Sequence, residues 1–324
     1  MLTIGNIKLN HPIVLAPLSG YTDIAMRRLC RHYGVELTFP GVMLAKSAAN
    51  PRVLCKPCFR PEGNESPIGA QILGTEVEYM VKAARDLVDA GFDMIDLNFA
   101  CPAPKVLRRG RGGHMLNDPD AVLEIFSRVR EAISCPMSVK LRIGYGDSEQ
   151  ARNNFFAIAD GLVKSGVDAI VVHGRTTLQK YSGKSNWGPI KQLKEMFPDT
   201  TIIGSGDIFN PQDVVDRLKE TGVDGILLAR GVVGNPWLIS EAIALLEGGD
   251  LPAAPTVEEV GKAMLWHLEM LFDRYDPGKA TRYFRKFAAQ YCRRHPQRKK
   301  TQIYLFEAND EKQIVPRIKE CFGV

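Results

Sequence analysis

Short apolar runs alternate with longer amphipathic stretches along most of the chain. Eight of these runs are rich in β-branched residues and nearly continuously apolar, which is typical of parallel strands covered on both faces. The predicted strands span residues 13–17, 37–42, 68–73, 94–98, 137–143, 169–173, 201–205 and 225–229. Stretches with helical spacing lie between them, among them 76–90, 120–133, 150–165 and 211–220. The pattern therefore predicts repeated βα units.

Residues with special backbone preferences mark the ends of these predicted helices. Asp118 and Asn210 each precede a proline, as an N-cap precedes a first-turn proline. Gly91, Gly166 and Gly222 follow helical stretches at the position that favours a positive φ. Eight βα units over about 245 residues match the usual size of a (β/α)8 TIM barrel. A doubly wound sheet is the alternative, but LSGYTD stands where its G-x-G-x-x-G turn would follow the first strand.

The strand rhythm stops near residue 250. Residues 247–255 (EGGDLPAAP) are small and rich in proline and glycine, as in a linker. Helical spacing follows over residues 257–275, 281–294 and 314–321, and Phe284, Phe287 and Tyr291 fall on one stripe that we expect to pack in a core. We therefore expect a TIM-barrel catalytic domain over residues 1–246, a linker over 247–255 and a small C-terminal all-α domain over 256–324.

The formal net charge of +5 is concentrated in this last domain. Residues 256–324 hold 14 Lys/Arg and 9 Asp/Glu, whereas the residues before them hold 28 of each. A neutral body with a basic appendage favours a polyanionic partner that the appendage binds. The candidate phosphate contacts, expected to form one outward-facing patch, are Arg282, Arg285, Lys286, Arg293, Arg294, Arg298, Lys299 and Lys300.

Several classes of protein are disfavoured by composition. No stretch approaches the ~20 consecutive apolar residues of a membrane helix, and the first residues lack a signal-peptide pattern, so we expect a cytoplasmic protein. The seven cysteines are odd in number and irregularly spaced, unlike a disulfide framework. Cys55 and Cys58 form one C-x-x-C without a second pair, so we expect two ordinary thiols and no metal site.

Polar and glycine residues gather where the predicted strands end, which is where enzymes of this fold carry their active sites. Glycine-containing clusters at 205–207 and 229–231 follow the last two strands, the usual phosphate-binding place. Lys140, His173 and Arg175 lie on or after the two preceding strands. Together they favour a bound phosphate over simple tight turns. For Lys140, a Schiff base and a purely structural role remain alternatives.

Cys101 lies on a loop that opens at the predicted barrel mouth. A structural cysteine is expected inside a strand or helix rather than on such a loop. A thiol with an ordinary pKa near 8.5 is mostly protonated at neutral pH and can act as a general acid toward a basic carbanion. The position therefore favours a functional role.

Eight motifs occur in a fixed order between residue 13 and about residue 240: APLSGYTD, GAQILG, DLNFACPAPK, GRGGHML, VKLRIG, HGRT, SGDI and LARG. This series resembles the tRNA-dihydrouridine synthase family, in particular its bacterial B-type branch. The resemblance implies a TIM barrel that binds FMN and a helical domain that grips tRNA, with ribosomal RNA as the alternative RNA substrate and a monomer as the expected state. It implies that NADPH, or alternatively NADH, reduces the flavin, and that hydride then passes from N5 to C6 of a flipped-out uridine.

The resemblance also implies roles for individual residues. Cys101 would protonate C5 of the uracil, and Asn98 and Arg175 would lie near the substrate with the basic residues of the tail. The implied cofactor contacts are Ala16, Pro17, Leu18, Gln71, Lys140, His173, Ser205, Gly206, Asp207, Ala229 and Arg230. The chain departs from the family pattern at Phe99-Ala100, Ser205, His114 and Asn117. All but Ser205 concern the fit of the RNA more than the binding of FMN.

Two other functions are compatible with parts of the sequence. A flavin barrel for free pyrimidines, like a dihydroorotate dehydrogenase, would share the barrel and the cysteine but has no use for a basic tail. An RNA-binding protein with a vestigial flavin site would keep the tail but has no use for Cys101 and Lys140.

Overall fold

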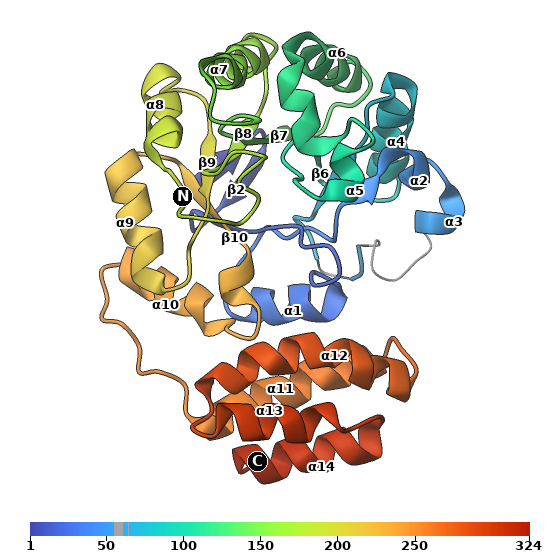
Figure 1. Cartoon of the computed structure of the whole chain (residues 1–324), viewed down its shortest axis with the longest axis vertical. Coiled ribbons are helices and arrows are strands. Elements are labelled where there is room, and N and C mark those ends of the chain that lie inside the picture. The colour runs from blue at the N-terminus through green and yellow to red at the C-terminus, as the bar shows by residue number, and fades with distance from the viewer. Residues whose placement is uncertain (55–60, 64) are drawn as a thin grey trace.

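The computed structural model describes residues 1–54, 61–63 and 65–324. Its main sheet has eight parallel strands in the order β3-β10-β9-β8-β7-β6-β5-β4, surrounded by helices (Figure 1). The strands are β3 (Ile13–Leu15), β4 (Met43–Leu44), β5 (Gly69–Leu73), β6 (Met94–Asn98), β7 (Met137–Arg142), β8 (Ala169–His173), β9 (Ile202–Ser205) and β10 (Gly225–Leu228). The predicted α/β TIM barrel with a C-terminal helical domain is confirmed.

The second predicted strand is wrong in its details. In place of one strand over 37–42, Leu37 and Thr38 form isolated parallel bridges to β3 and to Ile68, and β4 begins only at Met43. The bridges close the barrel, because the Leu15 N–H donates to the Leu37 carbonyl and the Gly69 N–H to the Thr38 carbonyl, both at 3.0 Å. Pro40 lies between the two pieces, and its missing N–H prevents a continuous ladder.

An N-terminal hairpin, which the apolar pattern did not predict, packs into the barrel. β1 (Leu2–Ile4) pairs antiparallel with β2 (Ile7–Leu9), and each strand has the alternating burial of a sheet with one covered face. Leu2 and Ile4 belong to the same core cluster as Met94 and Val171, which point into the barrel. Strands of three residues are too short for alternation to be recognised, which explains why the hairpin was missed.

The predicted N-cap residues and the predicted glycine stops lie at the ends of helices in the barrel domain. The side chains of Asp118 and Asn210 accept hydrogen bonds from backbone N–H groups of the first turn, and Gly91, Gly166 and Gly222 have φ values of 96°, 75° and 69°. The helices are α1 (Ile24–His32), α2 (Ala45–Ala48), α3 (Pro51–Leu54), α4 (Val77–Asp89), α5 (Pro104–Leu107), α6 (Pro119–Arg130), α7 (Glu149–Lys164), α8 (Gly188–Met196), α9 (Pro211–Thr221) and α10 (Trp237–Leu246). Short 3-10 helices span Gly112–Asn117, Arg230–Val232 and Cys292–Arg294.

Four helices form the C-terminal domain below the barrel (Figure 1). They are α11 (Val257–Phe272), α12 (Pro277–Tyr291), α13 (Arg298–Phe306) and α14 (Glu311–Phe322), of which α13 was not predicted. The stripe of Phe284, Phe287 and Tyr291 is fully buried and packs around His267, so the predicted core role of these aromatic residues is confirmed.

The helical domain contacts the loop that follows β3. Tyr283 on α12 donates its hydroxyl hydrogen to the Gly20 carbonyl at 2.8 Å, and Lys286 donates to the same carbonyl. The rings of Tyr21 and Phe287 meet edge to face with centroids 5.6 Å apart. Because this loop begins at a strand end of the barrel mouth, the two domains are joined close to the candidate site. Among the described residues, the structure contains no helix that is long and apolar enough to cross a membrane.

Candidate active site

Parallel register brings inward-facing polar residues of neighbouring strands side by side. Gln71 on β5 lies beside Asp96 on β6, and Asp96 lies beside Ser138 on β7. One layer higher, Asn98 lies beside Lys140. Alternate residues of a strand face the same side, so the barrel interior becomes polar toward the carboxyl ends of these strands.

The glycine clusters after β9 and β10 form the walls of one pocket. Its lining residues are His173, Ser205, Gly206, Asp207, Ile208, Phe209, Leu227, Ala229, Arg230 and Gly231. Gly206 has a φ of +133°, and a Cβ atom there would lie 2.8 Å from the Cβ of Ser185. The pocket therefore depends on the absence of a side chain at this position, as expected where backbone N–H groups approach a ligand.

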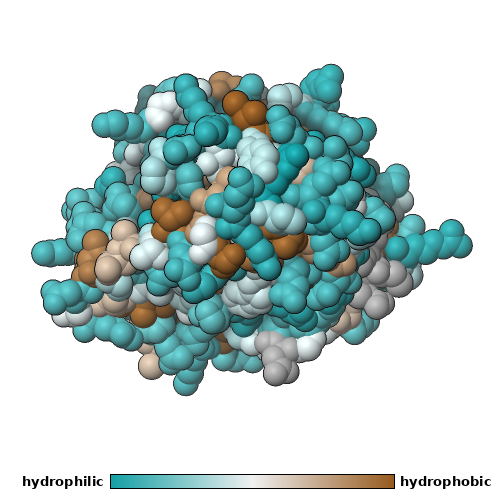
Figure 2. Space-filling model, turned by 90° about the horizontal axis from the view of Figure 1, so that it is seen from below, coloured by the Kyte–Doolittle hydropathy of each residue, from teal (hydrophilic) through white to brown (hydrophobic). Residues whose placement is uncertain are grey.

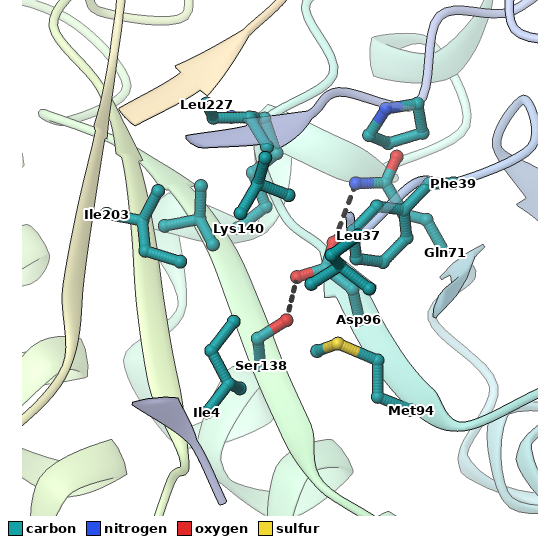
Figure 3. Close-up of a pocket in the computed structure, with 13 residues that line it drawn as sticks. Ile4, Leu37, Phe39, Gln71, Met94, Asp96, Ser138, Lys140, Ile203 and Leu227 are labelled. Carbon is teal, nitrogen blue, oxygen red and sulfur yellow. Dashed lines mark hydrogen bonds between the residues drawn. The ribbon is translucent and has the colours of Figure 1, made fainter. Parts of the chain in front are cut away.

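A second cavity occupies the barrel interior and shares Leu227 with the first. Pro17, Gln71, Asp96 and Lys140 are among the residues that line it (Figure 3). The two cavities together thus gather most of the cofactor contacts that the sequence predicted.

Two polar atoms at these cavities are buried without a hydrogen-bond partner among the described residues: Nζ of Lys140 and Nε2 of His173. Burial lowers the pKa of Lys140 to about 8, against the opposing effect of the Asp96 carboxylate. Burial and the nearby charge of Lys140 lower the pKa of His173 to about 2, so its imidazole is neutral. A buried polar atom without a partner is costly, and a polar ligand would satisfy both atoms.

Arg175 belongs to the loop that follows β8, and its side chain is buried beneath that loop rather than exposed at the surface. Its guanidinium donates to the Ser182 and Gly183 carbonyls, and it donates to Asp207 at 2.7 Å. Burial raises the pKa of Asp207, but hydrogen bonds from Arg175 and Ser185 outweigh this effect and lower it. The side chains of both residues therefore hold the loop, and Asp207 offers a ligand mainly its backbone.

Cys101 is held on the loop after β6 by its neighbours' polar groups. Oδ1 of Asn98 accepts hydrogen bonds from the N–H groups of Ala100 at 2.9 Å and Cys101 at 3.0 Å. The Gly113 N–H donates to the Cys101 carbonyl at 3.0 Å. Burial raises the pKa of the Cys101 thiol, although Arg142 opposes this effect, so the thiol stays protonated at neutral pH.

Arg142 is a residue whose role the sequence did not reveal. It is buried, and it donates at 2.8 Å to the Ala100 carbonyl and at 2.8 Å to the carbonyls of Thr176 and Lys180. It therefore joins the Cys101 loop to the loop after β8. The signal was present, because Arg142 follows Ser138 and Lys140 with the period of two that marks one face of a strand.

The first strand contributes mainly backbone to the barrel mouth. The Ala16 N–H donates to the Leu228 carbonyl at 2.7 Å, which fixes the end of β3 against β10. The Leu18 N–H donates to the hydroxyl of Thr22 at 2.9 Å, and Pro17 lines the interior cavity. No group of three or more metal-ligating side chains occurs in the described part of the chain, and Cys55 and Cys58 lie outside it.

Comparison with known proteins identifies the family of this chain. A family model described as dihydrouridine synthase matches residues 14–323. The chain belongs to the dihydrouridine synthase family. It is 34% identical over 294 residues to tRNA-dihydrouridine synthase B of Pasteurella multocida, covering 90% of this chain and 86% of the relative. It is 33% identical over 300 residues to tRNA-dihydrouridine synthase B of Xanthomonas campestris, covering 91% and 88%.

Two solved structures with a similar fold have a much lower sequence identity to this chain than these relatives. A histamine dehydrogenase from Rhizobium sp. 4-9 superposes with a TM-score of 0.57 at 14% identity, covering 83% of this chain and 50% of that chain. A 2-naphthoyl-CoA reductase superposes with a TM-score of 0.59 at 12% identity, covering 76% and 52%. The chain thus spans about half the length of these solved chains. At such identities the similarity shows the fold alone.

The basic tail of this family member does not face outward throughout. Arg285 donates to the Ala308 carbonyl at 2.9 Å, Lys286 to the Gly20 carbonyl, and Arg294 to Oδ1 of Asn235 at 2.6 Å. The expectation that these three form part of an exposed patch is wrong, because they join elements within the protein. The exposed members of the predicted patch are Arg282, Arg293, Arg298, Lys299 and Lys300. Seen from below, the side on which the helical domain lies, the surface is mostly hydrophilic (Figure 2).

Proposed function

We propose that this member of the dihydrouridine synthase family reduces uridine in tRNA to 5,6-dihydrouridine, with FMN as cofactor and NADPH, or alternatively NADH, as reductant. The observation that carries the proposal is a protonated thiol, Cys101, at a barrel mouth where Lys140 and His173 have buried atoms without partners among the described residues. The names of two curated relatives and a family match over nearly the whole chain support the choice of tRNA.

The residues at the mouth fit the chemistry of FMN. A phosphate needs backbone N–H groups that it can approach closely, and Gly206 and Gly231 provide a cradle that a Cβ would fill. Ala229 and Arg230 would complete this phosphate end, with Ser205 and Asp207 offering backbone groups. Lys140, Gln71 and His173 would bind the flavin ring system, and Ala16, Pro17 and Leu18 would lie against it. Bound there, reduced FMN supplies a hydride equivalent.

Cys101 would act as the general acid of the reaction. Hydride addition at C6 of uracil leaves negative charge at C5, because the C5=C6 bond is conjugated with the C4 carbonyl. The Cys101 S–H bond then breaks, and its proton forms the new C–H bond at C5. Burial keeps this thiol protonated until that charge develops, which suits an acid better than a nucleophile.

The exposed basic residues of the helical domain would bind the phosphates of tRNA. A uridine must leave its stack to reach a barrel mouth, at a cost of a few kcal/mol that is lowest in loops.

Asn98 would hold the Cys101 loop in place, because its side-chain oxygen accepts hydrogen bonds from two backbone N–H groups. Arg175 would act in the same way on the neighbouring loop, as a positioning residue.

A reconstituted reaction tests this function. The purified protein, supplied with FMN and NADPH, is incubated with unmodified tRNA, and dihydrouridine is measured by mass spectrometry. We expect product from the wild type and a rate lower by about 100-fold or more for Cys101→Ala, the usual contribution of a general acid. Cys135→Ala is the matched control, because Cys135 is also partly buried but precedes β7 at the other end of the barrel.

The outcomes separate the alternatives. Equal rates for Cys101→Ala and the wild type would remove Cys101 from the acid role. Reduction of free uridine as fast as tRNA would favour a flavin enzyme for free pyrimidines. Ribosomal RNA, offered in the same assay, tests the alternative RNA substrate.

A further inference from the structure

A buried carboxylate lies in the barrel interior with no role in the proposed reaction. Asp96 is 3% exposed and accepts hydrogen bonds at both oxygens. Ser138 donates its hydroxyl hydrogen to Oδ1 at 2.5 Å, and Gln71 donates from Nε2 to Oδ2 at 2.6 Å (Figure 3). The three residues come from three neighbouring strands that parallel register holds side by side.

This carboxylate begins a chain of hydrogen bonds that ends at Cys101. Gln71 accepts at Oε1 from Nδ2 of Asn98 at 2.6 Å. Asn98 in turn accepts at Oδ1 from the N–H groups of Ala100 and Cys101. Three consecutive links, from Asp96 to Gln71, from Gln71 to Asn98 and from Asn98 to Cys101, therefore connect a side chain inside the barrel to the backbone of the loop that carries the thiol.

The two ends of the chain determine how its two amides are turned. An ionised carboxylate can only accept, so Gln71 must present its NH2 group to Asp96 and its oxygen to Asn98. A backbone N–H can only donate, so Asn98 must present its oxygen to the loop and its NH2 group to Gln71. Turning either amide over would place donor against donor or acceptor against acceptor. One arrangement satisfies every polar atom in the chain.

Burial of Asp96 is unfavourable in itself, which argues against a simple packing role. Burial raises its pKa to about 6, although hydrogen bonds from Ser138 and Gln71 and the charge of Lys140 oppose this effect. An apolar residue of similar size would fill the barrel without this cost. A carboxylate at this position is therefore best explained by what it orients.

We propose that Asp96 is a positioning residue, which with Ser138 fixes the side-chain amides of Gln71 and Asn98 and thereby the place of the Cys101 loop. The effect of this positioning on catalysis rests on the proposed function. Cys101 remains the catalytic residue, and Asp96 acts on it through two amides without touching the substrate.

Two substitutions at Asp96 separate orientation from packing. Asp96→Leu keeps the branched side chain with its four heavy atoms but removes the acceptor for Gln71, so both amides lose their fixed orientation. Asp96→Asn keeps one acceptor, and the Ser138 hydroxyl can rotate to accept from the new NH2 group. We therefore expect the leucine variant to release the loop and the asparagine variant to keep it.

Alkylation of Cys101 by iodoacetamide, followed peptide by peptide with mass spectrometry, measures this release without flavin or RNA. The half-buried Cys135 serves as the internal reference in the same samples. We expect Cys101 to react roughly tenfold faster in Asp96→Leu. The loss of about one hydrogen bond should raise the equilibrium constant for opening of the loop by about that factor. In Asp96→Asn, the ratio of the two rates should stay near that of the wild type.

Steady-state kinetics on tRNA provides the second measurement. A misplaced acid lowers kcat, by roughly 10- to 100-fold for a shift of the order of 1 Å, whereas KM for tRNA should not change. Asp96→Asn should restore most of the rate. Equal losses in both variants, or a loss in KM alone, would contradict a positioning role.

The two hypotheses can fail separately. Unchanged alkylation of Cys101 in a folded Asp96→Leu protein would overturn the positioning role, whatever the activity. Selective acceleration in a protein that reduces no uridine would support the positioning role while the proposed function fails. If Asp96→Leu does not fold, Gln71→Met breaks the same chain one link closer to Asn98 and should release Cys101 equally.

Discussion

A methyl group placed at Gly206 should damage the phosphate end of the cofactor site. The alanine Cβ would lie 2.8 Å from the Cβ of Ser185 and 3.5 Å from Cε1 of His173. Ser185 cannot move freely, because Arg175 donates to its hydroxyl at 3.0 Å and its own N–H donates to Asp207 at 2.8 Å. Either the loop after β8 or the turn after β9 must therefore shift.

The size of the effect follows from these contacts. A φ of +133° at Gly206 costs an L-residue about 1–2 kcal/mol. Displacing Ser185 disturbs a charge-assisted hydrogen bond worth about 1.5–3 kcal/mol. Suppose that a shift of the pocket relieves roughly 3 kcal/mol of these unfavourable contacts in the FMN-free protein. FMN binding must then reverse this shift, and the dissociation constant of FMN should rise about 100-fold.

Titration of the flavin-free protein with FMN, followed by the change in flavin fluorescence, measures this dissociation constant. Gly222→Ala is the matched control, because Gly222 has a φ of +69° but no atom within 4 Å of the position a Cβ would take. We expect the control to lose about 1 kcal/mol of unfolding free energy and to bind FMN as the wild type does. A folded Gly206→Ala protein that binds FMN with unchanged affinity would refute the assignment of this pocket to the phosphate.

Three further predictions concern stability and RNA binding. Arg27→Met should lower the unfolding free energy by about 3–5 kcal/mol in urea denaturation, because it leaves the buried Glu65 carboxylate without its 2.8 Å ion pair; a loss below 1 kcal/mol would contradict this. Burial, with the charge of Lys286, lowers the pKa of His267 to about 3, so only the unfolded chain takes up this proton below pH 6.5. Stability should therefore fall by about 1.4 kcal/mol per pH unit between pH 6 and 3 on account of this residue, and His267→Phe should reduce that slope by the same amount; an unchanged slope would exclude the assignment. Alanine at the exposed basic residues from 298 to 300 should weaken tRNA binding and reduce the slope of log K against log salt by about 2–3, whereas alanine at Lys164 and Lys191 on the barrel helices should leave both unchanged.

The barrel could be predicted from the sequence because its signals are local. Covered parallel strands read as apolar runs, and Asp118, Asn210 and the glycines after the helices marked the ends of elements within one or two turns. The strand over 37–42 was wrong because its apolar run continues through Pro40, which interrupts the ladder. The first hairpin and α13 were missed because one is too short for periodicity and the other begins with charged residues.

The polar contacts of the site depend on three-dimensional packing and were predicted less completely. Lys286 and Arg294 carry the same charge as their exposed neighbours, and only docking of the helical domain on Gly20 and Asn235 turns them inward. Arg142 and Asp96 show the alternation of inward-facing positions, but no local pattern says which partners they meet. Strand ends identify where chemistry can occur, whereas hydrogen-bond direction decides what each residue does there.

The most direct test of the central claim is mapping of dihydrouridine in RNA from cells with and without this gene. The account predicts that particular uridines in tRNA lose the modification when the gene is deleted. The wild-type gene should restore it, and the gene for Cys101→Ala should not. Unchanged dihydrouridine in tRNA after deletion, or full restoration by Cys101→Ala, would contradict the proposed function.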